Sequence, residues 1–178
     1  MCGQIEIRLT GSGGQGLILG GIILAEAALQ DGKNAIQSQS YGPEARGGAS
    51  KAEVIISDDE IDFPKVNKAD LMLALTQTAC EKYSNTVKEN GILLVDASVT
   101  VPEGIHLGKI VKVPVLETAS NVIGKPMVAN IVAIGIIQEL LQTVSKESLE
   151  AAVLSRVPKG TEELNRRALE EGYKLARV

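Results

Sequence analysis

The stretch that decides the fold is Ile5-Glu6-Ile7-Arg8-Leu9-Thr10-Gly11-Ser12-Gly13-Gly14-Gln15-Gly16, together with the apolar segment after it. Its first half alternates apolar and polar residues, which predicts a strand that enters a tight glycine loop. The segment 17–30 follows as a helix whose strongly polar residues are Glu26 and Gln30 alone. Such a helix is usually buried on several sides. This start is Rossmann-like: a strand, a glycine loop and a buried helix.

The rest of the chain continues to alternate between strand and helix patterns. Segments 71–75 and 92–96 are continuous apolar runs, which are typical of strands covered on both faces. Further strands are expected from Ala35, over 51–57 and within 106–115, and a polar loop is expected over 37–48. Helices are expected over 76–90 (closed by Gly91), 117–123, 130–142, 146–156 and 161–176. We therefore predict an α/β protein, a three-layer α/β/α sandwich with a mostly parallel sheet, as one domain over residues 1–178.

The composition excludes several classes of function. The chain has 18 Lys and Arg against 22 Asp and Glu, a net charge of −4, which argues against an electrostatic nucleic-acid footprint. It has one Phe, three Tyr and no Trp, too few rings for a surface that stacks bases. Two cysteines and one histidine exclude a disulfide framework, a zinc or iron–sulfur site ligated by this chain's cysteines alone, and an HExxH-type metal site.

The apolar runs are also too short for a membrane span. The longest, 17–25 and 131–137, fall well below the about 20 residues that a spanning helix needs. The first residues lack the basic and apolar regions of a signal peptide. We expect a cytoplasmic protein that binds neither membrane nor nucleic acid.

The glycine loop fits the pattern G-x-G-x-x-G through Gly11, Gly13 and Gly16, with Gly14 and Gln15 between them. Glycines let the backbone approach a ligand closely, and the helix start offers free N–H groups to an anion. An NAD site also requires an acidic residue after the second strand, where this chain has Ser38-Gln39-Ser40. NAD is therefore disfavoured. Another phosphate-bearing ligand, or simply close packing of the strand on the helix, explains the glycines as well.

A second motif follows the second strand as Ser40-Tyr41-Gly42-Pro43-Glu44-Ala45-Arg46-Gly47-Gly48. Loops at the carboxyl ends of strands in α/β folds commonly bind ligands. Arg46 has the fork geometry to clamp a carboxylate or phosphate. An internal Glu44–Arg46 ion pair that merely stabilises the loop is an equally good interpretation.

A third motif surrounds Asn130, which opens an apolar helix after Gly124-Lys125-Pro126. An N-cap explains this asparagine adequately. The alternative is an amide aimed at a ligand at that helix end, with Lys125 near enough to meet a phosphate. His106, Cys80 and Cys2 have no catalytic partner at motif spacing, and we assign them no role.

Together these three motifs resemble the gamma subunit of 2-oxoacid:ferredoxin oxidoreductases. The resemblance rests on Gly11 to Gly16, Ser40 to Gly48 and Asn130-Ile131-Val132-Ala133-Ile134-Gly135, in that order and spacing, and covers essentially the whole chain. It implies a subunit of a multi-subunit enzyme that is inactive alone. The family oxidatively decarboxylates a 2-oxoacid with coenzyme A, giving acyl-CoA, CO2 and reduced ferredoxin. Among the oxoacids, 2-oxoglutarate is slightly favoured on general likeness.

The resemblance also implies where the cofactors lie. Thiamine diphosphate, magnesium and iron–sulfur clusters are expected in alpha, beta and delta-type partner subunits, with ferredoxin reached through the complex and coenzyme A as co-substrate. This chain is expected to bind no cofactor alone, in agreement with its two cysteines and its lack of a Gly-Asp-Gly…Asn stretch. No catalytic residue is assigned here, because the chemistry belongs to the cofactor.

The residues expected at the coenzyme A side or at the partner interface come from all three motifs. They are Gly11, Gly13, Gly14, Gln15, Gly16, Tyr41, Gly42, Pro43, Glu44, Arg46, Gly47, Gly48 and Asn130. Three alternatives remain: a stand-alone nucleotide- or coenzyme-A-binding module, the small subunit of an indolepyruvate-type oxidoreductase, and a purely structural assembly subunit. The apolar helix after the glycine loop further predicts that the isolated chain forms homo-oligomers.

Overall fold

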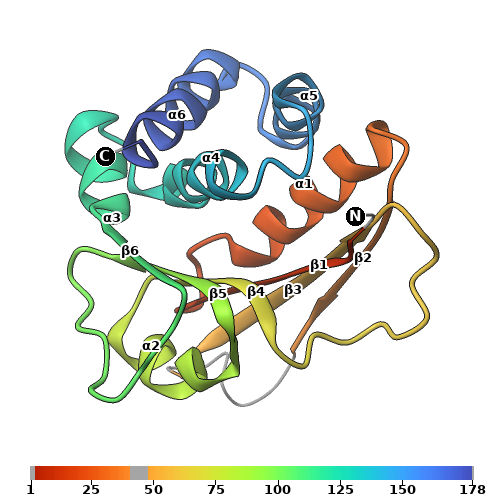
Figure 1. Cartoon of the computed structure of the whole chain (residues 1–178). Coiled ribbons are helices and arrows are strands. Elements are labelled where there is room, and N and C mark those ends of the chain that lie inside the picture. The colour runs from red at the N-terminus through yellow and green to blue at the C-terminus, as the bar shows by residue number, and fades with distance from the viewer. Residues whose placement is uncertain (1–2, 41–47, 178) are drawn as a thin grey trace.

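A computed structural model describes residues 3–40 and 48–177 of the chain (Figure 1). Its strands are β1 (Ile5–Gly11), β2 (Asn34–Gln39), β3 (Ser50–Ser57), β4 (Ala69–Ala74), β5 (Val87–Asp96) and β6 (Lys109–Val113). Its helices are α1 (Leu17–Gln30), α2 (Gln77–Tyr83), α3 (Val115–Glu117), α4 (Ala129–Leu141), α5 (Lys146–Arg156) and α6 (Glu162–Leu175). Short 3-10 turns cover Ser84–Thr86 and Pro126–Val128, and a π-helical turn covers Thr118–Val122.

The six strands form one sheet in the order β2-β3-β1-β4-β5-β6. Strands β1, β4, β5 and β6 are paired in parallel, whereas β3 runs antiparallel to both of its neighbours, β1 and β2. The sheet is therefore mostly parallel, as the alternation of strands and helices predicted. Strand β3 separates β1 from β2, so α1 crosses over a strand that comes later in the sequence.

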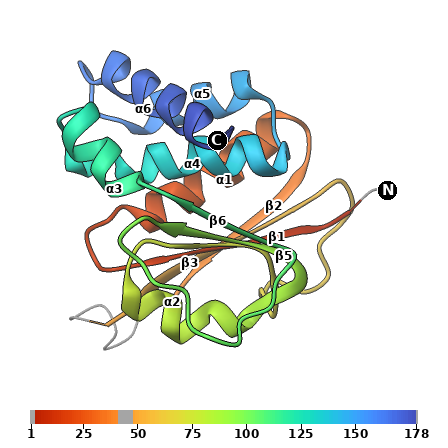
Figure 2. The same cartoon turned by 60° about the vertical axis from the view of Figure 1, so that its left-hand side comes forward.

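The helices cover the two faces of the sheet unequally. Figures 1 and 2 show α1, α4, α5 and α6 on one face, with α1 and α4 next to the sheet, and α2 on the other face. The larger core joins the helical side to Leu9, Val54 and Leu73, and the smaller core lies under α2 around Ile55 and Met72. This arrangement confirms the predicted α/β class and shows that the layer on the α2 side is thin.

Helix α1 is apolar nearly all round because its own chain covers it on several sides. It packs on β2 and β3, and α4 and α5 contact it as well. Seven of its residues are buried, among them Ile23 and Leu24. Its bounds agree with the predicted helix over 17–30, and those of α5 agree with the predicted helix over 146–156.

The predicted helix over 76–90 is wrong beyond Tyr83. Helix α2 ends there, and Gly91 lies inside β5 rather than at a helix end. Pairing between β4 and β5 shifts register between Ala69 and Leu71, and at Gly91 a Cβ would lie 3.0 Å from the backbone oxygen of Asp70. Glycine here permits the irregular strand pairing, which local sequence propensity cannot reveal. The polar loop expected over 37–48 also begins later, because β2 continues to Gln39.

Candidate functional site

The glycine loop leads from the end of β1 into α1. Gly14 and Gly16 have φ angles of 85° and 72°, in the left-handed region that disfavours residues with a Cβ. Gly16 is the residue that precedes the first turn of α1. These two glycines are required by the backbone whatever the loop binds.

Gln15 has a structural partner inside the loop. Its Oε1 accepts a hydrogen bond of 2.8 Å from the backbone N–H of Ser12. At Gly11 a Cβ would lie 2.2 Å from the same Oε1, so Gly11 leaves room for the returning amide. Gln15 and Gly11 thus shape the loop and do not line its open side.

Asn130 joins the start of α4 to the start of α1. It is buried, and its Nδ2 donates a 3.1 Å hydrogen bond to the carbonyl oxygen of Gly16. Its Oδ1 accepts from the N–H of Ile131 at 2.9 Å. The N-cap interpretation is wrong, because α4 begins at Ala129 and Val128 occupies the cap position. A Cβ at Gly16 would lie 2.5 Å from the Asn130 Nδ2, so the two residues are packed as a pair.

An open hollow lies in front of the first turn of α1, with a volume of about 640 Å³. Its polar wall consists of the glycine loop and serines that flank the second motif: Ser12, Gly13, Gly14, Gly16, Ser40 and Ser50. Its apolar wall is one face of α1, formed by Leu17, Ile18, Leu19 and Ile22. No described side chain caps α1, and its first intrahelical hydrogen bond runs from the Gly20 N–H to the Gly16 carbonyl. The N–H groups of the first turn, at Leu17, Ile18 and Leu19, therefore remain for an anionic group in this hollow.

The hollow brings together only part of the predicted site. Gly13, Gly14 and Gly16 line it, whereas Tyr41, Gly42, Pro43, Glu44, Arg46 and Gly47 lie outside the described residues. Gly48 is half-buried just before β3. The site residues expected from the sequence did not include Ser12 and Ser40, which belong to the first two motifs, or Ser50, which begins β3. Sequence reasoning also missed the role of Ile18 and Ile22, although their spacing of four residues marks one helix face.

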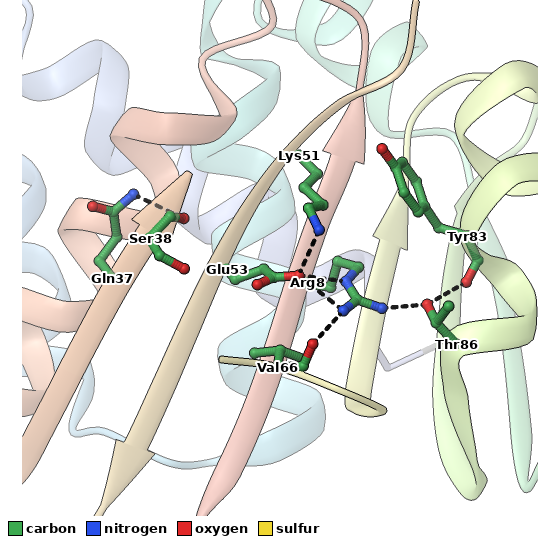
Figure 3. A network of polar contacts seen from close by, with 8 residues as sticks. All are labelled: Arg8, Gln37, Ser38, Lys51, Glu53, Val66, Tyr83 and Thr86. Carbon is green, nitrogen blue, oxygen red and sulfur yellow. Dashed lines mark hydrogen bonds and ion pairs between the residues drawn. The ribbon is translucent and has the colours of Figure 1, made fainter. Parts of the chain in front are cut away.

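A buried ionic network lies on the α2 face of the sheet, where the sequence analysis assigned no site (Figure 3). Arg8 and Glu53 are 4% and 7% exposed, and the Arg8 Nε donates to the Glu53 Oε1 at 2.9 Å. The Arg8 guanidinium also donates to the Val66 carbonyl at 2.7 Å and to the Thr86 hydroxyl. Lys51 approaches the Glu53 Oε1 at 3.3 Å. The signal in the sequence was a charged residue inside each of two apolar strands.

No metal site is present within residues 3–40 and 48–177. No group of three or more His, Cys, Asp or Glu side chains in these ranges is placed to hold a metal ion. Burial raises the pKa of the Cys80 thiol, with a contribution from the charge of Glu81, so the thiol stays protonated. In these ranges no helix is long and apolar enough to cross a membrane.

Comparisons with known proteins identify relatives of this chain. Residues 6–175 match the family described as "Pyruvate ferredoxin/flavodoxin oxidoreductase". The chain is 52% identical to the 2-oxoglutarate synthase subunit KorC of Methanocaldococcus jannaschii, over 97% of this chain and 94% of the relative. It is 31% identical to the pyruvate synthase subunit PorC of the same organism, over 96% of each chain. The structure of a keto/oxoacid ferredoxin oxidoreductase gamma subunit from Geobacter sulfurreducens superposes with a TM-score of 0.86 at 52% identity, covering 97% of this chain and 98% of that one.

The match to the family extends over nearly the whole described chain, and the relatives have about its length. The three sequence motifs predict the same relationship. The chain belongs to the pyruvate ferredoxin/flavodoxin oxidoreductase family.

Proposed function

We propose that this chain is the gamma-type subunit of an enzyme that oxidises 2-oxoglutarate with coenzyme A and passes the electrons to ferredoxin. As a family member the chain is a subunit of a 2-oxoacid oxidoreductase. One observation carries the choice of oxoacid: the identity of 52% to a 2-oxoglutarate synthase subunit against 31% to the pyruvate synthase subunit of one organism. Among the described residues, no pocket is lined by side chains that would identify a particular 2-oxoacid.

The redox cofactors of such an enzyme belong in other subunits. An iron–sulfur cluster is usually held by four cysteines, and this chain has two, of which Cys80 is buried. Its donor set therefore does not fit a cluster, and we assign clusters, thiamine diphosphate and magnesium to alpha, beta and delta-type partners. Ferredoxin would meet the complex through those chains.

The hollow at the glycine loop fits the coenzyme A side of the active site. The start of α1 favours a negative charge, and the wall of Ile18, Leu19 and Ile22 suits an apolar chain. Gly13, Gly14 and Gly16 would admit a phosphate to the backbone N–H groups. Gly11, Gln15 and Asn130 would hold the loop in shape. Arg46 and its neighbours in the second motif stay a sequence prediction for the same ligand or for a partner.

The first experiment is anaerobic purification of the tagged chain from its own cells, with mass spectrometry and an absorption spectrum. We expect cofactor-bearing partner chains to copurify, and the material to reduce viologen with 2-oxoglutarate and coenzyme A. Faster reduction with pyruvate or indolepyruvate would contradict the choice of oxoacid alone. A colourless chain without partners would favour a free-standing coenzyme-binding module.

A pair of substitutions at Ser12 tests the coenzyme A side. Ser12 is exposed at the rim of the hollow, and a hydrogen bond from its backbone, not its side chain, supports the loop. Ser12→Asp places a negative charge beside the proposed phosphate position, so the KM for coenzyme A should rise about tenfold or more while the KM for the oxoacid stays unchanged. Ser12→Asn has nearly the same size without the charge and should resemble the parent. Equal KM values for coenzyme A in the two variants would contradict the proposal that coenzyme A binds in this hollow.

A further inference from the structure

A second hollow lies on the opposite side of the sheet from α1, under the edge strand β2 and its neighbour β3. Its volume is about 390 Å³. The register pairs Ser38 with Glu53, and Glu53 with Arg8, so these side chains share the α2 face of the sheet. The segment 64–67, between β3 and β4, forms the other wall. This hollow shares Ser40 with the hollow of the glycine loop, and the function proposed above does not assign it a ligand.

The described residues that line this hollow combine polar side chains with apolar surface from Pro64 and Val66, and their net charge is positive. Lys51 and Lys65 line it together with Ser38, Ser40 and Asn67. Glu53 is the one acidic residue among the described lining residues, and its charge is balanced by the buried Arg8 at 2.8 Å. Two lysine charges thus remain for a ligand, with hydroxyl and amide groups beside them.

Lys51 is already held in place without a ligand. Its ammonium lies 3.3 Å from the Glu53 Oε1 and 5.9 Å from the centre of the Tyr83 ring (Figure 3). Glu53 is itself fixed by Arg8, which is bound in turn to Val66 and Thr86. A side chain that is ordered beforehand loses less conformational entropy on binding. Lys65 is exposed and forms no ion pair with another described residue.

We propose that this hollow binds the phosphate group of a small molecule. Lysine is a common phosphate ligand, because its ammonium group is a compact charge with three donors that can meet the several oxygens of a phosphate. The guanidinium of Arg8 is occupied by Glu53, Val66 and Thr86, so no arginine among the described residues offers a fork to the hollow. Hydroxyl and amide groups of Ser38, Ser40 and Asn67 line the same hollow as the lysines and can donate to a tetrahedral group with several acceptor oxygens. The volume admits a phosphate with a small attached group.

The test titrates inorganic phosphate into the full isotope-labelled chain and follows backbone amide signals by NMR. We expect saturable shifts at Ser38, Lys65 and Asn67 that chloride at equal ionic strength does not produce, and weaker shifts with acetate. Lys65→Gln should raise the Kd about tenfold. Lys159→Gln, in the exposed turn before α6, is the matched control and should leave the Kd unchanged.

Each other outcome overturns the proposal. Shifts that never saturate, or that chloride reproduces, would reflect ionic strength alone. Shifts confined to Gly13 and Gly14 would place the phosphate only in the hollow of the glycine loop. Acetate binding as tightly as phosphate would indicate a carboxylate site. Lys65 is exposed, so Lys65→Gln should keep the parent melting temperature, and an unchanged Kd in that folded variant would exclude Lys65 as a ligand.

Discussion

At the scale of single residues, the contact between Gly16 and Asn130 determines how the glycine loop is built. Gly14 and Gly16 both have positive φ angles, yet only Gly16 faces another side chain. Gly14→Ala should cost about 1 kcal/mol, from the backbone conformation alone. Gly16→Ala carries the same backbone cost and also drives a Cβ into the Asn130 amide, so it should cost about 3 kcal/mol in all.

Denaturant unfolding of the two variants measures this difference. Combining each variant with Asn130→Ala tests the cause. Removing the amide should recover part of the stability lost in Gly16→Ala and none of that lost in Gly14→Ala. Equal destabilisation by Gly14→Ala and Gly16→Ala would mean that the loop, and not its contact with α4, sets the requirement for glycine.

At the scale of elements, α4 and α6 cross in direct backbone contact. At Gly172 a Cβ would lie 2.3 Å from the Val132 carbonyl oxygen, and at Gly135 a Cβ would lie 2.6 Å from that of Leu169. Alanine normally stabilises a helix by about 1 kcal/mol relative to glycine. Gly172→Ala should instead lower the free energy of unfolding by about 2 kcal/mol, because the backbones cannot separate without losing core contacts.

The control for this prediction is Gly20→Ala in α1. There the nearest atom to a Cβ is the Leu9 Cδ1 at 3.4 Å, which is ordinary contact. Gly20→Ala should be neutral or stabilising in the same thermal or chemical unfolding experiment. A stabilised Gly172→Ala variant would show that α6 shifts freely along α4.

The junction between α1 and α5 should make stability depend on pH. Although desolvation by burial opposes ionisation, hydrogen bonds from Ser148 and Ser145 lower the pKa of Asp31, which ends α1. A carboxylate with a lowered folded pKa stabilises the protein above its unfolded pKa, and this contribution is lost as the pH falls through the folded pKa. Asp31→Asn should therefore be less stable than the parent near neutral pH, and the difference should disappear in acid. A difference that is independent of pH would show that the charge of Asp31 contributes nothing.

At the scale of the whole molecule, the α1 face at the glycine loop leaves apolar surface open. Leu19 lines both the hollow of the glycine loop and a smaller one beside Met127, which is 78% exposed. We therefore expect the isolated chain to self-associate through this face. Sedimentation over a wide concentration range should show oligomers that Leu19→Glu dissociates.

Leu29 provides the control on the same helix. It is 58% exposed at the far end of α1, so Leu29→Glu should leave the oligomers intact. A parent chain that sediments as a monomer at every concentration would contradict the prediction, and an equal effect of both variants would place the contact elsewhere.

The sequence predicted the molecule best where local pattern and tertiary packing agree. The bounds of α1 follow from its apolar run and from the Asp31-Gly32 stop. The prediction of a helix over 76–90 was wrong at its end, because Val87–Asp96 pairs with β4 as a strand although its first residues are polar and helix-like. Asn130 was recognised as important, but its bond to Gly16 spans 114 positions and has no local signature. The Arg8 network was missed for the same reason, since the partners of Arg8 come from three other segments of the chain.

The position of β3 between β1 and β2 constrains the order in which the chain can fold. Strands β1 and β2 both bond to β3 and not to each other, so the N-terminal half of the sheet has no partner until Ser50–Ser57 arrives. Contacts between residues that are far apart in the sequence slow folding, because chain entropy must be lost before they form. On the ribosome, a nascent chain that has emerged only as far as Gln39 would contain α1 but not β3, the strand that joins β1 to β2. The sheet should therefore begin to form only once β3 has emerged and can pair with β1 and β2.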